Sequence, residues 1–267
     1  MMKSDRITAA RQVIVHGDCW PVTTAVAHLV KSTLPDCDCE ATYTLPLLLQ
    51  QLSRQPEASL VLCLRPREHI FLFYALKNAL LYHPALVISD ELFFSDRLVL
   101  HSWGDIPAIL HGELTTAVAR RRRHDTGGLS EGRFADFLSA PAPVTGRFTV
   151  PLIFTTQKRL MNYMALLMYR ASVSSGVSPA QLRLLREVHR SRGKLSGLSA
   201  RLASKEKQIW QDKYRLLVKL GMRNRMRELL FGTRFCESVQ RTPFRVPEKT
   251  EQRHNIPDSG LMLSEKC

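Results

Sequence analysis

Short apolar runs alternate with amphipathic segments along the first part of the chain. The runs at Arg11–Trp20, Ala58–Pro66 and Ala85–Asp90 lie between turn-forming residues, which predicts buried strands. Between the first two runs, apolar residues recur at helical spacing, at Val22, Ala25, Val26, Leu29 and Val30. Strands that alternate with helices are typical of parallel βαβ units. The pattern therefore predicts a doubly wound α/β domain over residues 10–120.

Three further elements complete this predicted domain, and the position of its last strand stays open. A strand at Ala41–Thr44 precedes a helix at Leu45–Arg54, and another helix is predicted over His69–His83. The last strand falls at either Arg97–Ser102 or Ile106–Gly112, because both segments are short and apolar.

The middle of the chain, residues 121–176, predicts a linker and a connecting helix. Arginine runs, paired glycines and prolines are typical of loops and fill Ala119–Arg133 and Ser139–Gly146. Phe134, Phe137 and Leu138 mark a short helix between these two loops. Thr155–Ser172 has a leucine and methionine stripe at helical spacing, which packs into a core or forms a surface for a partner.

Three helices are predicted between Ser178 and Leu220, with a fourth after Gly221. The first opens with an N-cap serine followed by proline at the first helical position. The third helix starts near Lys205 and has Ile209, Leu216 and Leu220 on one apolar stripe. Gly221 ends this helix in the position that favours a left-handed backbone. The residues after Ser238 are rich in proline and polar groups, so a disordered tail is expected over residues 238–267.

Positive charge is concentrated in the same helical segment. Val177–Arg234 contains 15 lysine and arginine residues against 4 aspartate and glutamate residues, a balance of +11 out of the formal +14 of the whole chain. Such an excess favours a polyanionic partner, either nucleic acid or an anionic membrane. The longest apolar run, Ile70–His83, is too short to span a bilayer. No secretory segment precedes Val13, so a cytoplasmic protein is expected.

The third helix of this segment presents a second face, opposite its apolar stripe. That face is basic, amide-bearing and aromatic, which suits the major groove of DNA: basic groups meet phosphate, and amide or aromatic groups reach base edges. Lys213 and Lys219 are expected nearer phosphate. The candidate DNA-contact residues are Lys205, Lys207, Gln208, Trp210, Gln211, Lys213, Tyr214 and Lys219.

These residues belong to a segment that resembles a known family. The stretches "SPAQLRLLREV" and "LSARLASKEKQIWQDKYRLLVKLGMRNRMREL" are similar to the LuxR-type helix-turn-helix domain of bacterial transcription regulators, and "KLGMRNR" is the most specific part. The resemblance covers residues 177–234 and implies an all-α DNA-binding domain whose recognition helix begins at Lys205. Gln181, Trp210 and Asp212 depart from the family's usual residues, so base specificity does not transfer from relatives.

The same resemblance implies a receiver-like domain for the α/β part. Phosphoryl transfer to a receiver needs an acidic pair for Mg²⁺, an acceptor aspartate and a lysine. Only Asp18 of the acidic pair is present, Cys63 and Leu64 stand at the acceptor position, and no convincing lysine is found. The chain thus resembles the atypical, phosphorylation-independent LuxR-type regulators of enteric bacteria. That group implies a homodimer, or a heterodimer with another LuxR-type response regulator.

Two other functions remain open at the level of sequence. Asp212, Trp210 and the Thr155–Ser172 helix are compatible with an interaction protein that modulates another transcription factor without contacting DNA. An α/β enzyme would need a pocket that gathers His16, Asp18 and other polar groups. The chain has none of the common phosphate-binding, hydrolase or zinc-protease motifs, so no catalytic residue, metal or cofactor is expected. A metal held by Cys37 and Cys39 is a minor alternative, because their spacing does not fit the usual zinc sites.

Overall fold

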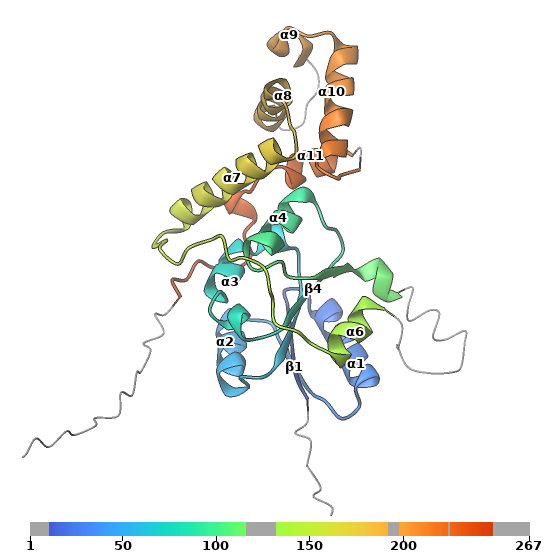
Figure 1. The fold of residues 1–267 in the computed structure, drawn as a ribbon, viewed down its shortest axis with the longest axis vertical. Coiled ribbons are helices and arrows are strands. Elements are labelled where there is room, and N and C mark those ends of the chain that lie inside the picture. The colour runs from blue at the N-terminus through green and yellow to red at the C-terminus, as the bar shows by residue number, and fades with distance from the viewer. Residues whose placement is uncertain (1–10, 116–131, 192–197, 224, 248–267) are drawn as a thin grey trace, which may run out of the picture.

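A five-stranded parallel sheet forms the centre of the α/β unit (Figure 1). The computed structural model describes residues 11–115, 132–191, 198–223 and 225–247. The strand order is β2-β1-β3-β4-β5, which is the order of doubly wound folds of the flavodoxin type. The strands are β1 (Gln12–Gly17), β2 (Asp38–Thr42), β3 (Ser59–Cys63), β4 (Ala85–Ser89) and β5 (Ala108–Leu110).

The predicted doubly wound domain is therefore observed, and the structure resolves the position of its last strand. Ile106–Gly112 contains β5, whereas Arg97–Ser102 lies in helix α4 (Phe94–Ser102). The predicted helix over His69–His83 is shorter in the structure, because α3 spans only Ile70–Ala75 and a 3-10 turn at Ala79–Leu81 follows.

Helices cover both faces of the sheet. Successive residues of a strand point to opposite faces, so Val13 and Val15 contact one layer and Ile14 the other. Helices α1 (Trp20–Thr33) and α6 (Arg133–Ser139) cover the first face. Helices α2 (Leu45–Arg54), α3, α4 and α7 (Gln157–Ser174) contribute to the core on the second face.

Helix α6 lies within the segment that the sequence predicts to be linker. Its aromatic residues Phe134 and Phe137 and its Leu138 are buried against the first face of the sheet. Arg11 also donates hydrogen bonds from Nη1 to the carbonyls of Leu138 and Ser139, at 2.5 and 3.0 Å. The short helix is thus a layer of the α/β unit rather than part of a connection.

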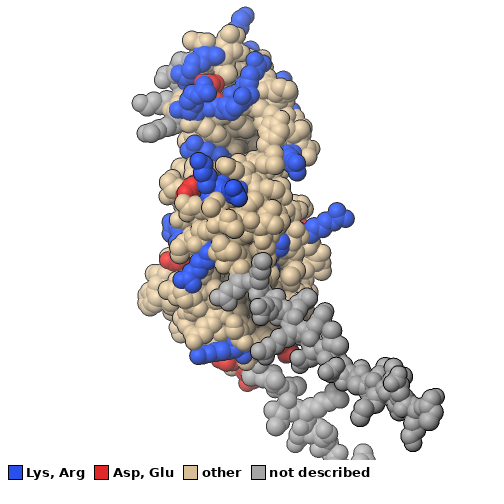
Figure 2. Space-filling model, turned by 90° about the vertical axis from the view of Figure 1, so that its left-hand side faces the viewer, with Lys and Arg blue, Asp and Glu red and all other residues tan. Residues whose placement is uncertain are grey.

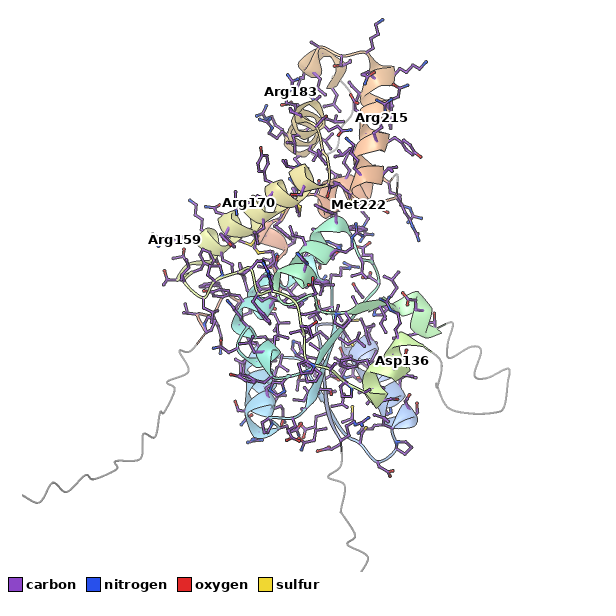
Figure 3. All side chains as sticks on the ribbon, viewed as in Figure 1. Asp136, Arg159, Arg170, Arg183, Arg215 and Met222 are labelled. Carbon is purple, nitrogen blue, oxygen red and sulfur yellow. The ribbon has the colours of Figure 1, made fainter. Side chains whose placement is uncertain are left out.

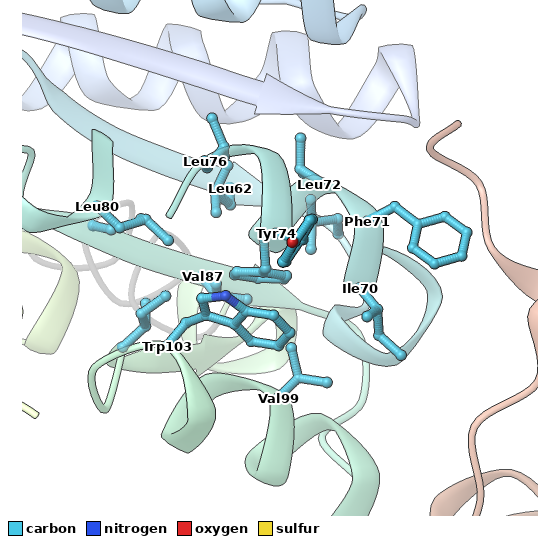
Figure 4. Close-up of a cluster of buried hydrophobic side chains, with 14 of the residues drawn as sticks. Leu62, Ile70, Phe71, Leu72, Tyr74, Leu76, Leu80, Val87, Val99 and Trp103 are labelled. Carbon is cyan, nitrogen blue, oxygen red and sulfur yellow. The ribbon is translucent and has the colours of Figure 1, made fainter. Parts of the chain in front are cut away.

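The second face holds the largest buried side chains of the described residues. Trp103 and Tyr74 are fully buried there (Figure 4). Phe73 is also fully buried, and its ring centroid lies 5.7 Å from that of Trp103. Helix α7 adds Leu160 and Met164 to this cluster. The methionine stripe predicted for α7 is therefore a core stripe.

Four helices form the C-terminal unit: α8 (Pro179–Arg190), α9 (Leu198–Leu202), α10 (Glu206–Lys219) and α11 (Met226–Gly232). Ser178 and Gln181 form a capping box at the start of α8: the Gln181 backbone donates to Ser178 Oγ at 3.3 Å and the Ser178 backbone donates to Gln181 Oε1 at 3.0 Å. The common core of the four helices contains Leu184, Val188, Leu198, Leu216 and Leu217.

Helix α4 joins the two units. Phe93, just before α4, is buried in the core of the C-terminal unit. Arg97 Nη2 donates to the carbonyl of Leu220 at 2.5 Å, and Arg227 of α11 pairs with Glu91 at 3.0 Å. The α/β unit therefore provides both an apolar and a polar support for the helical unit.

Residues 236–247, here called the C-terminal strap, return to the α/β unit. Gln240 accepts from the Ile70 backbone at 2.9 Å, and Phe244 stacks on Tyr74 with ring centroids 5.8 Å apart. Residues 238–247 therefore differ from the predicted disordered tail, because one aromatic ring and side-chain-to-backbone hydrogen bonds fix a segment of polar composition. Residues 248–267 lie outside the described residues.

Candidate nucleic-acid interface

Helices α9 and α10 are joined by a tight turn on the helical unit. Ala203 has a positive φ of 48° between them, which reverses the chain direction over a few residues. Helix α10 packs onto α8 and α9 through Ile209, Leu216 and Leu217, which are all buried. One side of α10 is therefore fixed, and the other side is available to a partner.

Seven of the eight candidate DNA-contact residues lie on exposed positions of α10 or at its start. They are Lys205, Lys207, Gln208, Trp210, Gln211, Tyr214 and Lys219. Trp210 is 43% exposed and Tyr214 is 55% exposed, which is high for large aromatic side chains. Arg215 is exposed on the same helix (Figure 3).

Lys213 has a different environment from the one predicted. Its side chain is only 6% exposed, and its Nζ lies 4.4 Å from the centre of the Trp210 ring. Burial lowers the pKa of the Lys213 ammonium. Cation–π contact of this kind orients the indole ring. The Lys213 side chain therefore packs against the ring of Trp210 instead of extending toward solvent.

Lys219 and Asp212 are held by contacts within the helical unit. Lys219 Nζ donates to the carbonyl of Gly176 at 2.6 Å and to Gln181 Oε1 at 3.1 Å. These bonds attach the end of α10 to the start of α8. Asp212 is partly buried and accepts a hydrogen bond from Gln208 Nε2 at 3.1 Å. The acidic residue that departs from the resemblance is thus engaged by an amide on its own helix.

A cleft beside α10 contains arginines that the sequence reasoning did not single out. It has a volume of about 310 Å³ and is lined by Arg183, Arg186, Arg190 and Arg201, together with Asp212. The first three residues recur at i, i+3 and i+7 on α8, opposite its leucine stripe, and this spacing is the signal that could have revealed them. Figure 2 shows cationic side chains gathered on the upper part of the molecule, where the helical unit lies.

A second cleft, of about 310 Å³, lies at the carboxyl ends of β1, β3 and β4. Ligands of doubly wound folds bind at this edge. In this cleft the carboxylates form ion pairs with arginines. Arg241 Nη1 pairs with Asp18 at 2.6 Å, and its Nε pairs with Glu68 at 2.9 Å. Arg65 pairs with Asp90 at 2.5 Å.

Asp18 is the most strongly perturbed carboxylate of this cleft. A hydrogen bond from His69, reinforced by Arg241, lowers the pKa of Asp18 to about 2. Cys63 is buried at the end of β3, and burial raises its pKa, so it is a neutral thiol. The cleft therefore has paired carboxylates and a thiol at the position that the resemblance gives to an acceptor aspartate.

An enzyme hypothesis would need His16 and Asp18 in one pocket. His16 is 5% exposed, shares a hydrogen bond of 3.0 Å with Thr42, and does not line the cleft that contains Asp18. Burial lowers its pKa to about 4. Among the described residues, no three histidine, cysteine or acidic side chains are grouped as metal ligands would be. No helix in the described ranges is both long and apolar enough to cross a bilayer.

Comparison with known proteins finds similarity in solved structures only. No protein-family model and no curated protein matches the chain. Solved structures of response regulators are similar in outline. A complex of the two-component response regulator RcsB with DNA shares 16% identity and a TM-score of 0.47, covering 83% of this chain and 96% of that one. The RcsB response regulator of Salmonella typhimurium shares 17% identity and a TM-score of 0.34, covering 86% and 98%. The architecture therefore rests on the sheet order and helix packing described above.

Proposed function

We propose that this protein is a sequence-specific DNA-binding transcription regulator and that α10 is its recognition helix. The observation that carries the proposal is the division of α10 into two faces. One face is buried by Ile209, Leu216 and Leu217, and the other exposes basic, amide and aromatic groups. An α-helix with such a face fits the major groove, where base edges present donors, acceptors and methyl groups.

The exposed residues divide by chemistry into two roles. Lys205 and Lys207 are suited to phosphate, because a flexible ammonium group makes sequence-independent contacts. Gln211 is suited to a base edge, since a glutamine can bond adenine with two hydrogen bonds. Gln208 is already bonded to Asp212, which favours Gln211 as the amide that recognises a base. Trp210 and Tyr214 offer apolar contact to thymine methyl groups.

Arginines of the neighbouring cleft extend the cationic surface beyond α10. Arg183 and Arg186 of α8 are exposed, and Arg201 of α9 is exposed as well. Glu187 pairs with Arg190 at 2.8 Å and with Arg201 at 3.4 Å, so part of this charge is neutralised within the protein. We assign Arg183 and Arg186 to the flanking phosphates, because no carboxylate among the described residues pairs with them.

For the α/β unit we propose a role in association that does not depend on phosphorylation. Asp18, Glu68 and Asp90 are each paired with arginine, and Cys63 lines the same cleft, at the position where the resemblance implies an acceptor carboxylate. A divalent ion would have to displace these arginines before it could bind. Association as a homodimer, or with another LuxR-type response regulator, follows from the sequence resemblance. A dimer would bind half-sites about one helical turn apart.

Selection of genomic DNA fragments by the full-length protein, over a series of salt concentrations, tests this function. The variant Lys207→Ala/Gln211→Ala changes the proposed contact face. Lys31→Ala/Gln50→Ala is its matched control, because it removes the same groups from exposed positions of α1 and α2. We expect a common motif that the first variant abolishes and the control retains. Motif-free binding that the first variant leaves unchanged would refute the assignment.

The second candidate function is an interaction protein that modulates another transcription factor without contacting DNA. The observation in its favour is the apolar part of the α10 face, where Trp210, Tyr214 and Val218 are all more than two-fifths exposed. Such a face also fits a protein groove. The same selection separates the two functions, because this candidate yields no enriched motif.

A further inference from the structure

Helix α7 is apolar on two opposite sides. Its core side contains Leu160, Met161, Met164 and Met168, which are buried. Its outer side contains Leu166, Tyr169 and Val173, which are 42%, 56% and 46% exposed. At about 100° per residue the three outer residues lie within about 60° of one another around the helix axis. They form a single stripe, here called the α7 stripe.

All charged residues of α7 are cations. Lys158, Arg159 and Arg170 are exposed, and Gln157–Ser174 contains no aspartate or glutamate. By helical geometry, Arg159 and Arg170 fall along one edge of the stripe and Lys158 along the other. Figure 3 shows Arg159 and Arg170 on α7, and Figure 2 shows basic side chains on the face that this helix presents.

We propose that the α7 stripe is a docking surface for an acidic amphipathic helix of a partner protein. Residues 166, 169 and 173 follow the i, i+3, i+7 spacing at which one helix lies along another. The stripe is about 10 Å long at 1.5 Å per residue, which corresponds to two turns of a partner helix. Acidic residues beside the partner's apolar stripe would meet Arg159 and Arg170 on one edge and Lys158 on the other.

Charge argues against the other possible occupants of this surface. A second copy of the chain would place the cations of its own α7 against Arg159 and Arg170, and like charges across an interface are unfavourable. DNA would neutralise the cations but leave Leu166 and Val173 in water. A lipid surface is wide and flat, whereas the exposed apolar residues of α7 form one narrow row.

The position of α7 gives such docking a consequence for the whole molecule. Helix α7 packs into the α/β core through Leu160 and Met164, and it leads through Gly176 into α8. Lys219, at the end of α10, bonds to the Gly176 carbonyl. A partner on α7 would therefore contact the connection between the two units. This surface is separate from the α10 face and does not depend on the proposed DNA binding.

Binding of a synthetic helical peptide to the full-length protein, followed by fluorescence anisotropy, tests the proposal. The probe carries leucines at i, i+3 and i+7 and glutamates elsewhere. A second peptide carries lysines in place of the glutamates, and a third has the first composition in scrambled order. We expect only the first peptide to bind, with an affinity that falls as salt increases.

Variants of the protein separate the contribution of each part of the surface. Leu166→Ser/Tyr169→Ser and Arg159→Gln/Arg170→Gln should each weaken the first peptide by about tenfold or more. The matched control Tyr43→Ser/Leu47→Ser changes the same residue types at exposed positions before and within α2 and should leave binding unchanged. Circular dichroism melts confirm that each variant is folded.

The outcomes that would overturn the proposal are equally specific. Equal binding of the scrambled peptide, or equal loss in the control variant, would show that the α7 stripe does not select a helix. Binding of anionic vesicles or duplex DNA that is lost with Leu166→Ser/Tyr169→Ser would assign the surface to lipid or nucleic acid instead. The variant Lys207→Ala/Gln211→Ala should bind the peptide normally, so failure of the DNA-binding proposal would leave this result intact.

Discussion

Replacing Asp96 with alanine should destabilise the contact between α4 and the segment that precedes α3. Asp96 is fully buried at the start of α4. Its carboxylate accepts hydrogen bonds from the backbone of Arg67 at 2.9 Å, from Arg67 Nη1 at 2.6 Å and from the backbone of Phe93 at 2.8 Å. Arg67 is itself 5% exposed and would retain its pairing with Glu91 and Glu68.

The expected loss follows from what the substitution leaves behind. Removing one member of a buried ion pair typically costs about 3–5 kcal/mol, because the other charge stays buried with fewer partners. Two backbone N–H groups also lose their acceptor, at about 1–3 kcal/mol each if no water reaches them. The pairing of Arg67 with Glu91 offsets part of this cost. We therefore expect Asp96→Ala to lower the free energy of unfolding by about 4 kcal/mol.

Urea denaturation of the full-length protein, followed by circular dichroism and tryptophan fluorescence, measures this loss. Asp96→Asn keeps the shape and one acceptor, so its cost should be smaller than that of alanine. The double variant Arg67→Met/Asp96→Ala removes both charges and should be more stable than Asp96→Ala alone. A loss below about 1 kcal/mol for Asp96→Ala, or additive costs in the double variant, would refute the view that this pair supports α4.

Three further predictions concern the helical unit. Lys207→Ala should reduce the slope of log affinity for DNA against log salt by about 0.9, whereas Lys213→Met should leave the slope unchanged because Lys213 is buried. Equal slopes in the two variants would contradict the different environments of the two lysines. Burial lowers the pKa of His189 from 6.5 to about 4, so on acidification the unfolded chain takes up the proton at a higher pH than the folded chain does. The free energy of unfolding should therefore fall by up to about 3 kcal/mol between pH 6.5 and pH 4. Urea midpoints measured over this range should fall less steeply for His189→Gln. Gly232→Ala would place a Cβ 2.8 Å from the sulfur of Met222 and should lower the free energy of unfolding by about 1–3 kcal/mol, as measured by thermal unfolding. An unchanged melting temperature would show that the surrounding side chains move to accommodate the Cβ.

The strands of the α/β unit could be predicted where burial is complete. All five residues of β3 and of β4 are buried, and such continuous apolar runs are typical of parallel strands covered on both faces. The segment at Arg97–Ser102 also has a short apolar run, at Leu98–Leu100, but forms a helix. The Asp96 carboxylate accepts a hydrogen bond from the Phe93 backbone and so caps α4. The same carboxylate pairs with Arg67, which lies far away in the sequence.

The burial and exposure of the α10 residues could be predicted in part from the sequence, and the misplaced residue has a physical cause. Helical period correctly separates the buried Ile209 and Leu216 from the exposed Lys207 and Gln211. Period alone places Lys213 beside the exposed face, but the long aliphatic stem of a lysine can be buried under an aromatic ring, and Trp210 provides that ring.

The C-terminal strap could not be predicted from composition for a related reason. Its fixed position comes from contacts over more than 160 residues of sequence, such as the hydrogen bond between Thr242 and His69 at 3.0 Å and the ring stacking of Phe244 on Tyr74. The sequence near residues 236–247 does not indicate which distant residues they contact. Segments of polar composition are therefore assigned safely only when their long-range contacts are known.

A change of base preference tests most directly whether α10 recognises DNA sequence. Glutamine favours adenine and arginine favours guanine in the major groove. Binding of randomised duplexes by the full-length protein and by Gln211→Arg should therefore yield two motifs that differ at one position of each half-site, with guanine gained in the variant. Identical motifs, or the absence of any motif with both proteins, would contradict the assignment of α10 as the recognition helix.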